Sequence, residues 1–244
     1  MTNNKKNNNK NNTNNNKLNN KNKVNKNNKI KTKNNTNNNK KNTSNNKKNN
    51  KTNVKVNNKN NKNYFPNNKN VNKSKLIITK ISLFNMMNKE MIDELVKSLG
   101  KASDLKKMTI TDLTGGSGIT ALNLSKYFKQ VNVVVSNEDT FKALEHNIKL
   151  YKVKNVKPIF GKPYELVKKL KQDIIFVHPM FKRGKKGISL YLDDKPMTEV
   201  LNKFEKDKII VKVPFNFNFN SFLKYLNRKK IGVEKMSKYF LIVL

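Results

Sequence analysis

The sequence lacks cysteine entirely, which excludes disulfide bonds and thiolate metal sites. With only two histidines as well, we expect no metal site. No apolar run approaches the roughly 18 residues of a candidate membrane span, and the N-terminus has no apolar core of a secretory signal. We therefore expect an intracellular protein of the cytoplasm or nucleus, or of a virion if the chain is viral, that is neither secreted nor inserted in a membrane.

Acidic residues are missing from the first part of the chain, where none precedes Glu90. Residues 1–74 are almost entirely asparagine and lysine, with 20 lysines and no arginine, in a chain of 244 residues whose formal charge is +37. Such a segment has too little apolar surface to offset the entropy of ordering it, so we expect a disordered basic tail. Its asparagine content is also what drift in an AT-rich genome would give.

The lysines of this tail form a polycation, which attracts polyanions through counterion release and loses that attraction as salt rises. RNA or another nucleic acid is the partner that we expect. A solubilising tail with only incidental affinity would have the same composition. Because arginine is absent, the contact would be diffuse and independent of sequence.

Apolar residues become concentrated from about Lys75, so we predict one folded domain over residues 75–244. Short apolar runs alternate there with stretches of helical spacing. Strands are predicted at 108–113, 131–136, 156–161, 173–179 and 208–215, and helices at 88–102, 119–129, 139–153, 163–171, 196–205 and 221–229.

This alternation predicts an α/β, Rossmann-like fold with a mainly parallel seven-stranded sheet and helices on both faces. Two final extended runs, 231–237 and 238–244, follow each other so closely that they must pair as an antiparallel hairpin at one edge. Ligands bind such a sheet outside the carboxyl ends of its strands. The residues just after each strand are therefore the candidates for a site.

After the first strand comes the run "DLTGGSG", residues 112–118. Glycines let the backbone turn tightly and approach a ligand closely. The alternative is a simple turn from strand to helix.

Three runs of the domain, "DLTGGSGIT", "ALEHNIKLYKVKNV" and "VHPMFKRGKKGISLYL", resemble the class I S-adenosylmethionine-dependent methyltransferases. Within them the domain is most similar to the RNA cap guanine-N2 methyltransferases of the trimethylguanosine synthase type. The resemblance implies S-adenosylmethionine as the cofactor and an RNA cap as the substrate. It also implies that Asp112, Thr114, Gly116 and Gly118 bind the amino-acid part of the cofactor.

Two cofactor positions depart from this family. The family ends its second strand with an acid that binds both ribose hydroxyls, whereas Ser136 or Asn137 stands here and Glu138 follows. A carboxylate displaced by one residue points to the other face, although a local shift of the loop would restore Glu138 as a ligand. After the third strand, Lys162 replaces the acid that holds the adenine amino group, and a lysine cannot accept a hydrogen bond.

The run "HPMF" occupies the place where the family has a polar acceptor, two prolines and an aromatic ring that stacks on the purine. The resemblance makes His178, Pro179 and Phe181 the candidate catalytic residues. A neutral imidazole has one acceptor nitrogen, so His178 can substitute for the acceptor. Met180 removes the second proline and the rigid turn with it, which favours the other interpretation, a relic of a lost site.

Basic residues follow directly, and Lys182, Arg183, Lys185 and Lys186 are candidate ligands of substrate phosphates on a loop. A solvated basic loop is the alternative. The run "PFNFNFNSF", residues 214–222, would present rings to nucleic-acid bases or pack against the sheet, and packing is the interpretation we favour.

Three functional hypotheses remain from the sequence. One is a methyltransferase-like protein that acts on RNA, nominally at N2 of the cap guanosine, with its activity retained, weakened or lost. The alternative is a catalytically inactive methyltransferase fold that binds nucleic acid or a partner protein through its basic surface and tail. The third, which we favour least, is a structural protein that packages nucleic acid through its tail.

Overall fold

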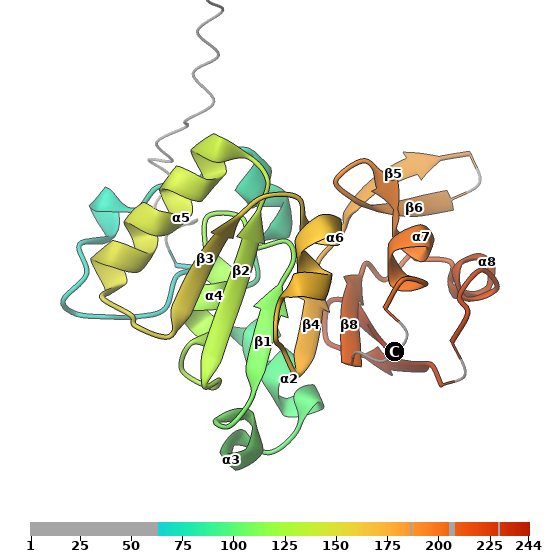
Figure 1. Ribbon diagram of the computed structural model, residues 1–244, viewed down its shortest axis with the longest axis horizontal. Coiled ribbons are helices and arrows are strands. Elements are labelled where there is room, and N and C mark those ends of the chain that lie inside the picture. The colour runs from blue at the N-terminus through green and yellow to red at the C-terminus, as the bar shows by residue number, and fades with distance from the viewer. Residues whose placement is uncertain (1–62, 186, 205–207, 229) are drawn as a thin grey trace, which may run out of the picture. The chain divides into compact units, whose positions relative to one another are not determined.

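The computed structural model of the protein describes residues 63–185, 187–204, 208–228 and 230–244. Its centre is a seven-stranded sheet in the order β3-β2-β1-β4-β8-β10-β9 (Figure 1). The strands are β1 (Thr109–Asp112), β2 (Gln130–Val135), β3 (Val156–Phe160), β4 (Ile174–Val177), β8 (Lys208–Val213), β9 (Gly232–Lys235) and β10 (Phe240–Val243).

The pairing confirms the predicted fold. Strands β3, β2, β1, β4 and β8 run parallel, while β10 pairs antiparallel with both β8 and β9. The closing hairpin therefore lies at the edge of the sheet, as its short connection requires.

Both faces of the sheet are covered, because successive strand residues bury their side chains on opposite sides. The helices are α2 (Lys89–Leu99), α3 (Ala102–Leu105), α4 (Ile119–Leu124), α5 (Glu138–Tyr151), α6 (Pro163–Leu166), α7 (Met197–Leu201) and α8 (Phe219–Leu223). In β4, Ile174 and Phe176 join one hydrophobic cluster, with residues of α2, α4 and α5. Ile175 and Val177 join a second cluster, with residues of α7 and α8.

Asparagine side chains mark the starts of three helices. Asn88 accepts a hydrogen bond from the backbone N–H of Met91 at 2.9 Å and so begins α2, as the sequence predicts. Asn137 caps α5 and Asn218 caps α8 in the same way.

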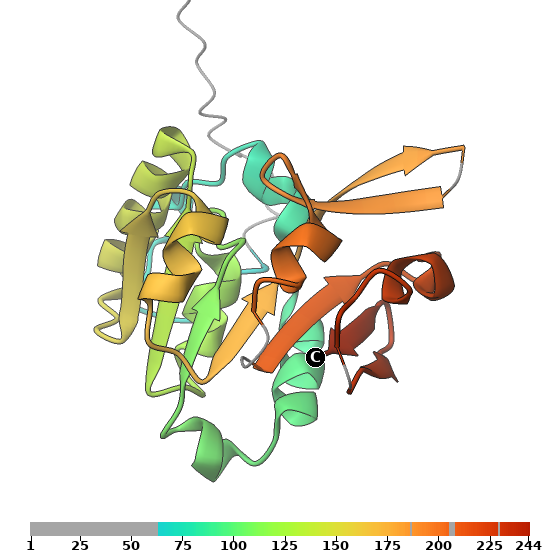
Figure 2. The same cartoon turned by 45° about the vertical axis from the view of Figure 1, so that its right-hand side comes forward.

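The prediction of a basic loop after β4 is wrong, because the structure has an antiparallel hairpin there. Strands β5 (Met180–Gly184), β6 (Gly187–Leu192) and β7 (Lys195–Pro196) form a separate three-stranded sheet. Figure 2 shows the β5–β6 ribbon extending away from the central sheet. Strand β5 buries none of its side chains and β6 buries only Leu190 and Leu192, so the hairpin lacks the apolar run by which a strand is predicted.

Residues 63–74, predicted from the sequence to be part of the tail, pack against the domain. Phe65 is 2% exposed and stacks on Tyr151, with ring centroids 6.1 Å apart. The hydroxyl of Tyr151 donates a hydrogen bond to the carbonyl of Pro66 at 2.7 Å. The predicted disorder of residues 1–62 lies outside the described residues.

Most rings of the 214–222 run pack, as favoured from the sequence. Phe217 and Phe222 are buried and meet edge to face, with centroids 5.1 Å apart. Phe215 is the exposed ring of this run, and it also contacts Phe240.

Candidate functional site

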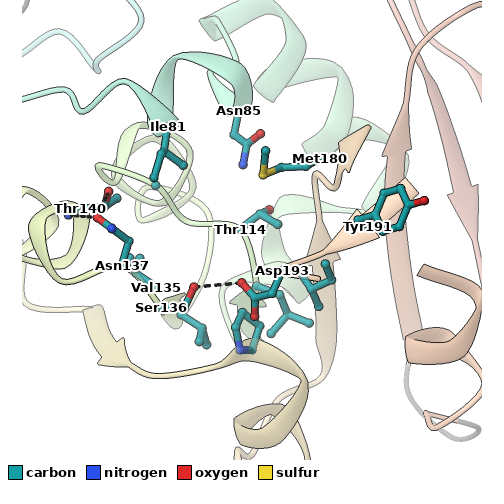
Figure 3. Close-up of a pocket in the computed structure, with 15 residues that line it drawn as sticks. Ile81, Asn85, Thr114, Val135, Ser136, Asn137, Thr140, Met180, Tyr191 and Asp193 are labelled. Atoms are coloured by element: carbon teal, nitrogen blue, oxygen red, sulfur yellow. Dashed lines mark hydrogen bonds between the residues drawn. The ribbon is translucent and has the colours of Figure 1, made fainter. Parts of the chain in front are cut away.

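A shallow pocket lies at the carboxyl ends of β1 and β2, with a cavity volume of about 80 Å³. Its walls are formed by the 3-10 helix η2 (Ile81–Asn85), the turn after β1, the end of β2, the three-stranded sheet with its turns, and the first turns of α5 and α6 (Figure 3). The lining residues are Ile81, Asn85, Leu113, Thr114, Gly116, Val134, Val135, Ser136, Asn137, Thr140, Pro163, Met180, Tyr191, Leu192 and Asp193.

The glycine turn after β1 forms the floor. Gly116 and Gly118 have φ values of 50° and 89°, in the left-handed region that favours glycine. A Cβ at Gly116 would lie 3.1 Å from the Oγ of Ser82, so a side chain here would crowd the wall opposite. Gly116 lines the pocket, whereas Gly118 faces Leu144 of α5 and serves packing.

A chain of buried hydroxyl groups fixes η2 against this turn. Thr79 Oγ1 lies 2.8 Å from Ser82 Oγ and 3.0 Å from Thr140 Oγ1, and Ser82 Oγ lies 2.7 Å from Ser117 Oγ. The backbone N–H of Thr79 also donates to Ser117 Oγ. These bonds join the N-terminal segment, the glycine turn and α5 into one wall, a connection that no pattern in the sequence predicts.

Asp112 stabilises the glycine turn by accepting hydrogen bonds from Thr114. Its Oδ1 accepts from the backbone N–H and the hydroxyl of Thr114, at 2.8 and 3.1 Å, while its Oδ2 is buried without a partner. Burial raises the pKa of Asp112 to about 6, against the lowering effect of the two bonds from Thr114. Thr114 lines the pocket and Asp112 does not, so the carboxylate acts on a ligand only through the turn that it holds.

Glu138 lies outside the pocket. It is the first residue of α5, its side chain is 69% exposed, and it pairs with Lys142. Ser136 and Asn137 line the pocket in its place, and Asn137 is engaged in capping α5 through Thr140.

A carboxylate that was not among the predicted site residues reaches the same place from the hairpin. Asp193 lies in the turn between β6 and β7, with a φ of 53°, and its Oδ1 accepts from the Ser136 hydroxyl at 2.9 Å (Figure 3). Asp193 is accessible to solvent, but partial burial still raises the pKa of its carboxyl, and the bond from Ser136 opposes that shift. The paired acids at 193 and 194 indicate a turn in the sequence, but no pattern there relates them to a strand end 57 residues earlier.

His178 follows β4 and is tied into the protein on two sides. Its backbone N–H donates to Thr114 Oγ1 at 2.8 Å, and its Nε2 lies 3.1 Å from the Nζ of Lys212 on β8. The ammonium donates this bond, so Nε2 is the acceptor and the ring proton lies on Nδ1, which is buried without a hydrogen-bond partner.

The surroundings lower the pKa of both groups, which leaves His178 neutral at pH 7 and Lys212 mostly protonated. Burial first and the Lys212 ammonium second lower the pKa of His178 to about 3, and the Asn85 backbone opposes that shift. Burial lowers the pKa of Lys212 to about 8, and its Nζ lies 4.9 Å from the centre of the Tyr239 ring. His178 is therefore a neutral side chain whose acceptor nitrogen is already occupied.

The other candidates after β4 are divided between core and surface. Pro179 is buried, whereas Met180 and Phe181 are 49% and 46% exposed at the base of the hairpin, and only Met180 lines the pocket. Lys182, Arg183 and Lys185 are exposed on the hairpin, with Lys182 Nζ 4.8 Å from the centre of the Tyr191 ring.

Two further candidates stand apart from the pocket. Lys186 is outside the described residues. Lys162 pairs with Glu165 at the surface, and the next residue, Pro163, lines the pocket instead.

Neither a metal site nor a membrane span occurs within the part of the chain that the structure describes. No three His, Asp or Glu side chains there are grouped so that they could hold a metal ion. None of the described helices is long and apolar enough to cross a membrane.

Comparison with known proteins places this site in a family context. The family model described as "Conserved hypothetical protein 95" matches residues 78–214, more than half of the chain. Uncharacterized protein L320 of Acanthamoeba polyphaga mimivirus is 37% identical over 147 residues, which cover 54% of this chain and 57% of that protein. The chain therefore spans little more than half the length of this curated relative.

Among solved structures, a putative methyltransferase from Porphyromonas gingivalis W83 has a TM-score of 0.52 and 21% identity, covering 71% of this chain and 44% of that one. The putative methyltransferase yhhF from Escherichia coli has a TM-score of 0.44 and 16% identity, covering 62% of this chain and 81% of that one. The likeness to the Porphyromonas gingivalis structure confirms the predicted methyltransferase fold.

Proposed function

The chain belongs to the family described as conserved hypothetical protein 95, and from this premise we propose that it is an S-adenosylmethionine-dependent methyltransferase that acts on RNA. The protein has a methyltransferase fold. The observation that carries the proposal is the pocket, where a glycine turn and the end of β2 meet the base of a hairpin that carries exposed basic residues outside the pocket.

The residues of the pocket fit this cofactor. Gly116 has a φ of 50°, and a Cβ there would press on Ser82, so glycine suits this turn of the pocket. Asp193 offers a carboxylate at the end of β2, and Leu113, Val134 and Leu192 offer apolar surface for a ring. When bound, the cofactor supplies a methyl group on a sulfonium that is already activated, so these residues need mainly to bind and align.

The RNA part of the proposal rests on the hairpin. Met180 and Phe181 are exposed beside Lys182 and Arg183, so apolar and aromatic surface lies next to cations. Bases stack on exposed rings, and phosphates bind to lysine and arginine. The lysines of residues 1–74 would add affinity that does not depend on sequence.

N2 of the cap guanosine is the acceptor that we propose from the resemblance of the "HPMF" run. His178 cannot accept from this amino group while Lys212 occupies its Nε2. Asn85 lines the pocket beside Met180, and its Oδ1 is buried without a partner (Figure 3). Rotation of this amide would present the oxygen to a target amino group, with Asn85 taking the role expected of His178.

A second candidate function is favoured by the contact between His178 and Lys212. A neutral His178 held by a buried lysine, next to an exposed methionine, is what a decayed site would leave. In that case the protein is a methyltransferase fold that binds nucleic acid, or a partner protein, without transferring a methyl group.

The experiment is a methyl-transfer assay with the full chain, methyl-labelled S-adenosylmethionine, and the same RNA with and without a 7-methylguanosine cap. We expect label in the capped RNA, recovered as N2-methylated guanosine after digestion. Gly116→Ala should abolish transfer through strain at a positive φ in the pocket floor. Gly232→Ala is the matched control, since its Cβ would make an ordinary contact 3.6 Å from Val243, outside the pocket.

The outcomes separate the candidates. Equal labelling of both RNAs would contradict the cap guanosine as the methyl acceptor but would still support an RNA methyltransferase. Binding of S-adenosylhomocysteine with no transfer to either RNA would support the inactive fold. If no binding of S-adenosylhomocysteine is found at millimolar concentration, the cofactor proposal fails.

A further inference from the structure

The pocket has one feature that its glycine turn does not explain. Among the described residues that line it, Asp193 is the single one with a charged side chain, in a chain with 53 basic and 16 acidic residues. Its neighbour Asp194 is exposed and does not line the pocket. A single carboxylate among uncharged lining residues favours a ligand that brings hydrogen-bond donors to it.

The position of this carboxylate indicates which donors. In doubly wound sheets the phosphate or amino-acid end of a nucleotide-like ligand lies at the turn after the first strand. An acid about 20 residues further along the chain then binds the ribose hydroxyls beside the second strand. Glu138 has that spacing from Gly116, but it points away from the pocket and pairs with Lys142. Asp193 occupies the end of β2 instead, fixed to Ser136.

The hydrogen bond from Ser136 leaves the carboxylate ready for a ligand. The hydroxyl donates to Oδ1 at 2.9 Å, and none of the described residues donates to Oδ2. A carboxylate has about four acceptor positions, so both oxygens retain capacity for further donors. The side chain is also exposed, and a ligand in the pocket can reach it without any rearrangement of the protein.

We propose that Asp193 determines specificity for the ribose of the cofactor by accepting hydrogen bonds from its hydroxyl groups, with Ser136 orienting the carboxylate. The proposal rests on the proposed function of the pocket as an S-adenosylmethionine site. In this proposal the residue that binds the ribose lies in the turn after β6 and not at the end of β2. This turn belongs to the same small sheet as the basic hairpin. Cofactor and hairpin are then linked through one structural element.

The test is isothermal titration of the full chain with S-adenosylhomocysteine and with its 2′-deoxy and 3′-deoxy forms. A hydrogen bond to a charged group affects affinity by about 10-fold or more, so Asp193→Asn should weaken S-adenosylhomocysteine by that factor. The deoxy forms should bind the wild type more weakly, and Asp193→Asn should weaken them little further. Asp194→Asn is the matched control and should stay within about twofold, a change too small to reflect the removal of a hydrogen bond.

A purely structural role of Asp193 in the turn would give a different result. Asp193→Asn would then weaken the binding of S-adenosylhomocysteine and of the deoxy forms equally, which would overturn the proposal while leaving the cofactor site intact. Unchanged affinity in Asp193→Asn would overturn it as well. Failure of the wild type to bind any of the three ligands would overturn the proposed function and this inference together.

A second variant guards against loss of folding. Ser136→Ala keeps the carboxylate and removes only the hydroxyl that orients it. We expect a loss of a few-fold for S-adenosylhomocysteine, with the preference over the deoxy forms retained. Loss of that preference in Ser136→Ala would contradict the role given to Asp193.

Discussion

Lys212 and His178 form a buried pair with no carboxylate in it. The pair satisfies the ammonium through a single neutral acceptor, Nε2, and through the face of Tyr239. Removing the acceptor leaves a buried cation without its hydrogen bond, which is costly, whereas removing the cation and keeping its stem is often neutral or stabilising. The two side chains are therefore expected to differ sharply in their effect on stability.

His178→Ala should lower the free energy of unfolding by about 2–4 kcal/mol, because Lys212 loses its acceptor and the ring leaves a cavity. Lys212→Met should change it by less than about 1 kcal/mol or raise it, since the apolar stem is kept. Urea unfolding of both variants beside the wild type measures the difference. A loss in Lys212→Met as large as that in His178→Ala would mean that the ammonium itself stabilises the fold.

The pKa values of His178 and Asp112 predict opposite responses to acid. His178 has a pKa of about 3 in the folded protein and 6.5 ordinarily, so the unfolded state takes up a proton that the folded state refuses. Stability from His178 is fully present above pH 6.5 and falls toward pH 3, by up to about 1.4 kcal/mol per pH unit. Asp112, with its pKa raised from 3.8 to about 6, holds a proton when folded and adds stability as the pH falls through that interval.

Substitution separates these two contributions. His178→Gln should make the free energy of unfolding less sensitive to acid between pH 6.5 and 4, and Asp112→Asn should make it more sensitive. Urea unfolding at a series of pH values measures both slopes against that of the wild type. Parallel slopes in all three proteins would contradict the assignment of these protons.

At the scale of single residues, the sequence identifies the changed positions but not what replaces them. It shows that an acid is absent at the end of β2 and that His178 stands for an acceptor. It cannot show that Lys212 occupies this ring or that Asp193 reaches Ser136, because both contacts join segments far apart in the chain. Periodicity and spacing report neighbours along the chain, whereas such contacts depend on the order of strands in the sheet.

Elements are predictable in proportion to their burial. The strands β2, β4 and β8 of the central sheet are buried on both faces and are mostly apolar, with Asn132 and Lys212 as the buried polar exceptions, so they are predicted from the sequence. The β5–β6 hairpin buries little and is predicted as a loop. A hairpin stabilised mainly by its own backbone pairing leaves almost no hydrophobic pattern in the sequence.

This hairpin is the element for which we predict a measurable contact with RNA. The double substitution Lys182→Ala and Arg183→Ala should weaken RNA binding by the full chain and lower the salt slope of the affinity by about one for each phosphate that is no longer bound. Lys106→Ala with Lys107→Ala is the matched control, because these exposed lysines follow α3, away from the pocket. Fluorescence anisotropy at several salt concentrations gives both quantities. Equal losses of affinity in the two double variants would mean that the hairpin contributes only through the overall positive charge and makes no specific contact with RNA.

For the whole molecule, charge and pocket are separable contributions to function. Residues 1–74 carry 20 lysines and no acid, whereas every acidic residue and every residue that lines the pocket follows position 80. Deleting residues 1–62, which leaves Phe65 and its packing intact, should lower RNA affinity and its salt slope. The same deletion should leave the affinity for S-adenosylhomocysteine within about twofold, since no lining residue is removed. A loss of cofactor affinity on this deletion would show that the tail takes part in the site.

Hydrogen–deuterium exchange of the full chain, with and without millimolar S-adenosylhomocysteine, tests most directly that the pocket is the cofactor site. Slower exchange is predicted in three segments at once: the turn at 112–120, the end of β2 at 134–137, and the hairpin turn at 190–194. A separate cavity lies between the segment around Phe65 and the side chain of Tyr127. Protection confined to that cavity, or no protection in any segment, would contradict the account.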